Sequence, residues 1–201
     1  PQPLSEVETL TVANAVAPNE SVTWTTSTTP PVDPARYAPL AASMRRKDLA
    51  LPLDGTNARS VALGRELAAR HAGNPRAIVG ELLAMFRQQP FVYTMQPPRL
   101  ADNAVDEFLF DTRKGFCEHY ASAFTVVMRA AGVPARVVTG YQGGEFNPFG
   151  GYLIVRQSDA HAWSEVWIEG RGWSRVDPTA AVAPERIQGS LIDAVAEDEP
   201  V

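Results

Sequence analysis

The stretch GFCEHYASAFTVVMRAAGVPAR, residues 115–136, joins a helical pattern to the start of a strand and decides the fold class. Its small and apolar residues recur on one helical face at steps of four, three, four and three, and they are Cys117, Ala121, Phe124, Met128 and Ala131. Gly132 and Pro134 end this pattern, because glycine is favoured just past a helix and proline cannot continue one. From residue 135 the hydrophobic period changes to two, which indicates a strand. The stretch therefore predicts a helix over 117–131 that packs on a sheet.

Further strand patterns fill the C-terminal half, and helical patterns precede the central stretch. The strand candidates are residues 135–141, 152–157, 161–168 and 172–177, with glycine-containing turns between them. The last two are close enough in sequence to form a hairpin. One helix is expected over 57–71 with Asn57 as its N-cap, and another runs from the Asn74-Pro75 cap to Gln89. Helices followed by an antiparallel sheet predict the α+β class.

The remaining segments have weaker patterns. Residues 1–55 are interpreted as an extended arm or part of a β-region with a short helix, including a strand over 21–26. Residues 91–94 are expected to be extended, and residues 102–111 are expected to form a loop. Residues 56–190 form the main domain, and residues 191–201 an acidic tail.

Composition excludes several classes of protein. Hydrophobic residues make up 45% and charged residues 20%, which is ordinary for a globular domain. The net charge of -5, without a cluster of basic and aromatic residues, argues against nucleic acid as a partner. No apolar run is long enough for a membrane span, and one cysteine cannot form an intramolecular disulfide. Because the chain begins at Pro1 without a methionine, we expect it to be part of a longer protein.

Cys117, the only cysteine, could be a metal ligand, a packing residue or a nucleophile. Cys117-x-His119 is not a usual zinc spacing, and no second cysteine completes a structural site. Residues two apart on a helix point about 200° away from each other, so His119 cannot easily reach the Cys117 sulfur. A buried free cysteine is a common small hydrophobe. However, the first turn of a helix stabilises a thiolate through unpaired backbone N–H groups and the helix dipole, which favours a nucleophile.

A nucleophilic cysteine needs a base, and the base needs a group that orients it. His161 lies on a predicted strand with Trp163 on the same face, and Asp177 ends the next predicted strand. If Trp163 pairs with Asp177, the carboxylate is a diagonal neighbour of His161, whereas a slip of one residue moves it to the other face. We therefore predict this register, or a bulge with the same effect. The structural alternative for His161 is a histidine that is hydrogen-bonded within the sheet without a catalytic role. For Asp177 it is a turn residue before Pro178.

Three stretches together resemble the transglutaminase-like superfamily. They are residues 115–121 continued by 129–136, then HAWSEVW at 161–167, then GWSRVDPT at 172–179, and the resemblance covers about residues 75–187. Residues 91–98, 106–110, 138–144 and 183–187 are similar to the periplasmic domain of bacterial multi-pass membrane proteins of this superfamily. The resemblance implies a papain-like fold with residues 56–190 as the catalytic domain. It also implies a periplasmic location, with the parent protein anchored in the inner membrane by helices outside this sequence.

The resemblance assigns roles to the site residues. Cys117 would be the nucleophile, His161 would hold its proton in a thiolate–imidazolium pair, and Asp177 would orient the imidazole. The backbone N–H of Cys117 would be one oxyanion donor and the side chain of Tyr93 the candidate for the second, although a strand aromatic in the core is the alternative for Tyr93. No metal and no other cofactor are implied, because the acidic residues of 102–111 lack the spacing of a calcium loop.

The function expected from this resemblance is protein-glutamine gamma-glutamyltransferase activity through a thioester intermediate. Its partners would be a protein or peptide with a glutamine donor and an amine acceptor. A cysteine peptidase or amidase with the same triad is the first alternative, because the chemistry up to the thioester is shared. A non-catalytic binding or structural module is the second.

Overall fold

The computed structural model describes residues 39–52, 55–147, 149–150 and 152–188, so the strand expected over 21–26 and the acidic tail lie outside the described residues. The helices are α1 (Ala42–Asp48), α2 (Ala58–Arg70), α3 (Pro75–Gln88), α4 (Ala104–Asp106), α5 (Cys117–Ala130) and α6 (Glu185–Gln188). A π-helical segment η2 (Glu107–Thr112) follows α4, and η3 (Gln157–Asp159) and η4 (Pro178–Ala181) are 3-10 turns. The strands are β1 (Val92–Tyr93), β2 (Lys114–Gly115), β3 (Ala135–Tyr141), β4 (Glu145–Asn147), β5 (Tyr152–Ile154), β6 (Ala160–Ile168) and β7 (Gly172–Val176). Within the described ranges, every helix is too short or too polar to span a lipid bilayer.

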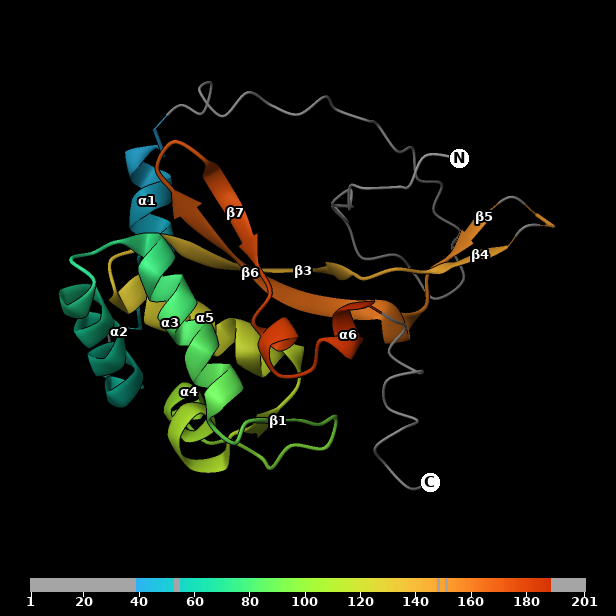
Figure 1. The fold of residues 1–201 in the computed structure, drawn as a ribbon, viewed down its shortest axis with the longest axis horizontal. Coiled ribbons are helices and arrows are strands. Elements are labelled where there is room, and N and C mark those ends of the chain that lie inside the picture. The colour runs from blue at the N-terminus through green and yellow to red at the C-terminus, as the bar shows by residue number, and fades with distance from the viewer. Residues whose placement is uncertain (1–38, 53–54, 148, 151, 189–201) are drawn as a thin grey trace.

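The central sheet is antiparallel with the strand order β3-β6-β7, as Figure 1 shows. In the β6–β7 hairpin Ser164 lies opposite Val176, and Trp167 lies opposite Trp173. Continuing this ladder by one pair places Trp163 opposite Asp177, which is the predicted register. The hairpin therefore sets His161 and Asp177 on the same face of the sheet.

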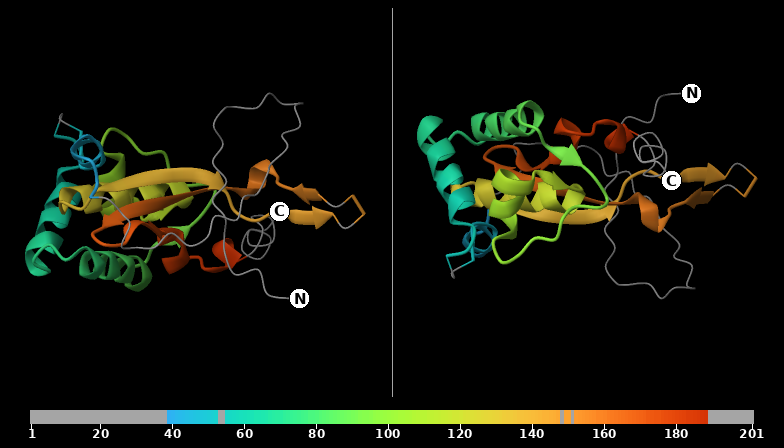
Figure 2. Two further views of the ribbon diagram at one scale, coloured as in Figure 1. Left: turned by 90° about the horizontal axis from the view of Figure 1, so that it is seen from above. Right: turned by 90° about the horizontal axis from the view of Figure 1, so that it is seen from below.

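The strand expected over 152–157 is shorter than predicted and lies outside the central sheet. β5 ends at Ile154 and pairs only with β4, and this hairpin projects from the rest of the described chain (Figures 1 and 2). The backbone N–H of Arg156 donates to the Asp159 carboxylate at 2.7 Å, which turns the chain into η3 before β6 begins. Local alternation predicts a strand but cannot name its pairing partner, which explains the error.

Residues 104–112 are helical, so the loop expected over 102–111 is wrong for all but its first two residues. The Asn57 side chain was expected to cap helix α2, but it makes no hydrogen bond there. It instead accepts hydrogen bonds from Val105 N and Asp106 N at the start of α4. In return, the Asp106 carboxylate accepts from Arg59 N at 2.9 Å and Ser60 N at 2.7 Å at the start of α2. Two helix N-termini thus cap each other across 46 to 49 residues of sequence, which local patterns cannot reveal.

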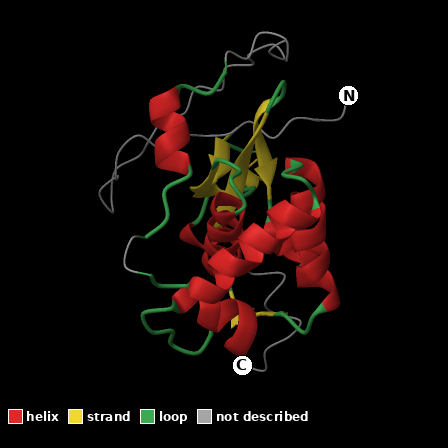
Figure 3. Cartoon of the chain, turned by 90° about the vertical axis from the view of Figure 1, so that its left-hand side faces the viewer, coloured by secondary structure: helices red, strands yellow, loops and turns green. Residues whose placement is uncertain are grey.

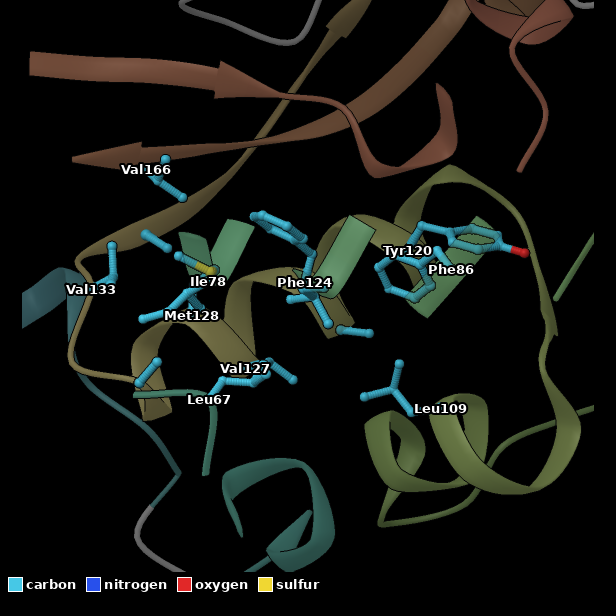
Figure 4. Packing of buried hydrophobic residues seen from close by; sticks show 14 of the residues in the cluster. Leu67, Ile78, Phe86, Leu109, Tyr120, Phe124, Val127, Met128, Val133 and Val166 are labelled. Atoms are coloured by element: carbon cyan, nitrogen blue, oxygen red, sulfur yellow. The ribbon is translucent and has the colours of Figure 1, made fainter. Parts of the chain in front are cut away.

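Helix α5 lies at the centre of the hydrophobic core, between the sheet and helices α2 and α3 (Figure 2). Figure 4 shows its fully buried residues Tyr120, Phe124, Val127 and Met128 among side chains from α2, α3 and β6. Gly64 permits the close approach of α2, because a Cβ there would lie 2.5 Å from the Val127 carbonyl oxygen. Most helices gather below the central strands in Figure 3, so one face of the sheet is covered and the α+β class is confirmed.

Candidate active site

Cys117 is the first residue of α5 and is 8% exposed. Cys117 forms a small buried cluster with Ala121 of the same helix and Ala162 of β6, and Phe116 packs against this cluster. Glycine is required before it, because a Cβ on Gly115 would lie 2.6 Å from the Cβ of His119. The sulfur is therefore held at the junction between the start of a helix and a strand of the central sheet.

His161 lies on β6 and is oriented by Asp177. The Nε2 atom of His161 is 2.8 Å from Oδ2 of Asp177, and the two side chains are only 7% and 9% exposed. The other carboxylate oxygen, Oδ1, accepts a hydrogen bond from Thr179 N at 3.2 Å. Arg175 donates to Oδ2 at 3.2 Å and stacks over the Trp163 ring with its guanidinium carbon 4.2 Å from the centroid. Every oxygen of the carboxylate thus has a donor, which fixes its direction toward the imidazole.

The Cys117 thiol is close enough to His161 to raise the pKa of its ring, so the imidazole lies between the thiol and the carboxylate. Because Nε2 faces Asp177, Nδ1 is the ring nitrogen left for the sulfur. Burial alone lowers the pKa of His161, but the hydrogen bonds to Asp177 and Cys117 raise it to about 9 overall. The arrangement favours an imidazolium at neutral pH, which is the partner that a thiolate needs.

His119, two residues after Cys117, belongs to different surroundings. Its Nδ1 accepts from Phe116 N at 3.4 Å, and its ring packs edge-on against Phe116 at 4.5 Å between centroids. Burial lowers its pKa, which keeps the ring neutral. It also lines a cavity of about 430 Å³ with the loop around Pro97. His119 thus has a packing role at the start of α5, where it contacts Phe116.

Tyr93 lies beside the start of α5. Its strand β1 pairs in parallel with β2, which sets Tyr93 level with Gly115, two residues before the cysteine. Burial raises the pKa of the Tyr93 phenol, while donation from Arg186 and from the Cys117 backbone N–H lowers it in part. The phenol is thus within reach of the atoms around Cys117, as an oxyanion donor would have to be.

Two arginines at the site, Arg175 and Arg186, were missed by sequence reasoning. Arg175 contacts Asp177, and Arg186 donates to Tyr93 Oη at 3.1 Å. The signal for Arg186 was present, because residues 183–187 form one of the stretches that carry the resemblance. Its partner lies 93 residues earlier, so the contact is visible only in the fold.

Among the described residues, no group of three or more His, Cys, Asp or Glu side chains could hold a metal ion. Asp106, the buried member of the acidic stretch at 102–111, has its carboxylate directed at the backbone of α2. The polar groups nearest to Cys117 are thus the His161 imidazole, the Asp177 carboxylate behind it and the Tyr93 phenol.

Comparisons with known proteins show the family to which the chain belongs. The family model of the transglutaminase-like superfamily matches residues 66–178. A protein-glutamine gamma-glutamyltransferase of Pseudomonas aeruginosa is 56% identical over 154 residues, which are 77% of this chain and 23% of that protein. The uncharacterized protein YebA of Bacillus subtilis is 41% identical over 86 residues, which are 41% of this chain and 12% of YebA.

Solved structures give the same answer for the fold. The crystal structure of the periplasmic domain of TgpA from Pseudomonas aeruginosa matches with a TM-score of 0.72 and 54% identity, over 75% of this chain and 52% of that one. The same domain bound to ethylmercury matches with a TM-score of 0.70 and 55% identity, over 73% of this chain and 52% of that one. The chain thus spans about half of that domain and less than a quarter of the curated relative. The predicted family resemblance and fold are confirmed, and the matched domain is periplasmic, as was expected for this chain.

Proposed function

The chain belongs to the transglutaminase-like superfamily, and on that premise we propose that it is a cysteine-dependent acyltransferase with Cys117, His161 and Asp177 as its catalytic triad. The observation that carries the proposal is the position of His161, whose Nε2 hydrogen-bonds to Asp177 at 2.8 Å and whose ring has its pKa raised by the nearby Cys117 thiol. A histidine placed in this way takes the thiol proton and is stabilised as imidazolium by the carboxylate behind it.

The acyl donor is a glutamine side-chain amide. The Cys117 thiolate attacks the amide carbon, forming a carbon–sulfur bond and a tetrahedral oxyanion. The His161 imidazolium gives its proton to the nitrogen, the carbon–nitrogen bond breaks, and ammonia leaves. A primary amine such as a lysine side chain then attacks the thioester while His161 accepts a proton from it. The carbon–sulfur bond breaks, and the new amide leaves behind the thiolate–imidazolium pair.

Two donors would stabilise the oxyanion. The backbone N–H of Cys117 stands at the positive end of α5, where backbone donors have no partner within the helix. The Tyr93 phenol would be the second donor, a role that its proximity to Cys117 supports. The site needs no metal and no other cofactor, because the thiol, the imidazole and these donors supply every proton transfer and the charge stabilisation.

The partners follow from the chemistry and from the relatives. The donor is a protein or peptide with an accessible glutamine, and the acceptor is an amine. The similarity to the periplasmic domain of TgpA supports a periplasmic site of action, with the parent protein anchored in the inner membrane.

The test uses a glutamine-containing peptide and a fluorescent primary amine, with Cys117→Ala as the control. Ammonia release together with incorporation of the amine into the peptide is the expected result, and both should be absent from the control. Ammonia release without incorporation would identify an amidase that hydrolyses the thioester. If wild type and control both release no ammonia from a panel of glutamine peptides, and no thioester is found by mass spectrometry, the proposal is wrong.

A further inference from the structure

The segment from Asp177 to Arg186 touches the surroundings of Cys117 at both of its ends. At one end Asp177 acts on the cysteine through His161. At the other end Arg186 of α6, which is 6% exposed, places its Nη2 atom 3.1 Å from the Tyr93 hydroxyl. Its guanidinium carbon also lies 4.6 Å from the centroid of the Tyr93 ring. A buried cation that contacts both the ring and the hydroxyl of one tyrosine is an unusual arrangement for packing alone.

Tyr93 is fixed next to the nucleophile by three independent contacts. The backbone N–H of Thr94 donates to the Gly115 carbonyl at 3.0 Å, which ties β1 to the residues just before Cys117. The Tyr93 ring stacks on Tyr120, one turn along α5 from the cysteine, at 6.2 Å between centroids and 11° between planes. Arg186 donates a hydrogen bond to the Tyr93 hydroxyl at the end of the side chain.

The hydrogen-bond roles determine where the phenol proton can go. Arginine has donors and no acceptor, so Arg186 can only donate to the Tyr93 oxygen. The Tyr93 proton must therefore point to another group, and the acceptor in the structure is the Met95 sulfur at 4.0 Å. A thioether is a weak acceptor, and an oxyanion would replace it readily.

We propose that Arg186 is a positioning residue of this site, which holds the Tyr93 phenol so that its proton is donated to the oxyanion formed beside Cys117. The inference rests on the proposed acyl transfer and adds a residue to it. Donation from Arg186 to the phenol oxygen polarises the O–H bond and strengthens the donation of its own proton, because hydrogen bonds in a chain reinforce one another. The planar guanidinium contacts the ring and the hydroxyl together, which a lysine ammonium does not do as well.

Two reactions of the same sulfur separate this role from a structural one. Alkylation by iodoacetamide displaces iodide at a saturated carbon and forms no oxyanion, whereas acylation by p-nitrophenyl acetate passes through one. Loss of one oxyanion donor slows a reaction about 100-fold to 1000-fold, so Tyr93→Phe should slow acylation by about 100-fold. Arg186→Gln should slow it about tenfold, because the donor remains but is less polarised. Alkylation should change less than about twofold in both variants, and the exposed Arg87→Gln is the matched control.

The double variant and a conservative variant decide between the outcomes. If Arg186 acts through Tyr93, Arg186→Gln should add no further loss to Tyr93→Phe, and Arg186→Lys should recover part of the acylation rate. The inference is wrong if Arg186→Gln acylates like wild type. It is also wrong if alkylation and acylation fall together, since Arg186 would then only maintain the structure. Failure of the proposed function looks different, because wild type itself would be alkylated but would form no acyl-enzyme.

Discussion

The two ends of helix α5 contribute to the protein in different ways. The turns from Tyr120 onward are enclosed by the main hydrophobic core, where Phe124 and Met128 have no exposed surface. The first turn carries Cys117, whose small cluster contains only Ala121 and Ala162 as further buried residues. The polar groups around this turn come from β6, β1 and the segments that follow β7.

This difference separates stability from reactivity within one helix. Burial of large apolar side chains stabilises the fold in proportion to the area removed from water, so the far turns of α5 should control the free energy of unfolding. Reactivity at the first turn depends on a few hydrogen bonds and on their direction. The two properties should therefore respond to different substitutions, and the following experiments can sharpen or break that separation.

The largest effect is expected for Asp177→Asn. Asparagine can keep the hydrogen bond from Thr179 N, but its amide donates toward His161 Nε2 and favours the wrong tautomer. Acyl transfer should fall by about 10000-fold, the loss that this substitution causes in the Ser-His-Asp triad of serine proteases. The measurement is amine incorporation into a glutamine peptide alongside thermal unfolding. A variant with wild-type transfer would remove Asp177 from the triad, and one that is unfolded at assay temperature would contradict the separation.

The next largest effect is expected in the core turns of α5, where a substitution should lower stability but leave the reactivity of Cys117 unchanged. Phe124→Ala should lower the free energy of unfolding by about 3–5 kcal/mol, because it leaves a cavity in the core. The alkylation rate of Cys117, measured well below the melting temperature, should stay near that of wild type. Phe149→Ala is the matched control, since Phe149 is fully exposed at 101% and its loss should leave stability unchanged. A large fall in alkylation by folded Phe124→Ala would show that the two ends are coupled.

A smaller effect is expected at the mutual caps that support the helices around α5. Asp106→Ala removes the acceptor for Arg59 N and Ser60 N and should cost about 1–2 kcal/mol of stability. Denaturant unfolding measures this change, and the exposed Asp102→Ala is the control from the same acidic stretch. Equal stability of the two variants would show that the caps contribute nothing to the free energy of unfolding. A change in Cys117 reactivity would show that the caps also affect the site around Cys117.

The separation between the two ends also explains what the sequence could predict. The period of α5 and the alternation of β6 and β7 arise from local packing, so the helix, the hairpin and the approach of Asp177 to His161 followed from them. The contacts that depend on distant segments did not follow. The caps between Asn57 and Asp106, the separate β4–β5 hairpin and the contact of Arg186 with Tyr93 all join residues whose pairing has no local pattern.

The most direct test of the thiolate–imidazolium pair is the rate of iodoacetamide alkylation against pH, for wild type and for His161→Ala. Cys117 is the only cysteine, so the label reports on one site. The pKa of His161 is raised to about 9, so its protonated form should persist from acid pH up to that value and should be lost above it. Thermal unfolding of the variant serves as the check that it remains folded.

The predicted result is an alkylation rate in wild type that changes less than about tenfold between pH 6.5 and 8.5. The rate for His161→Ala should fall about 50-fold from pH 8.5 to pH 6.5, as that of a thiol that titrates near 8.5 would. Identical pH profiles for the two proteins, with both rates falling steeply below about pH 8.5, would contradict the account, because Cys117 would then react without help from His161.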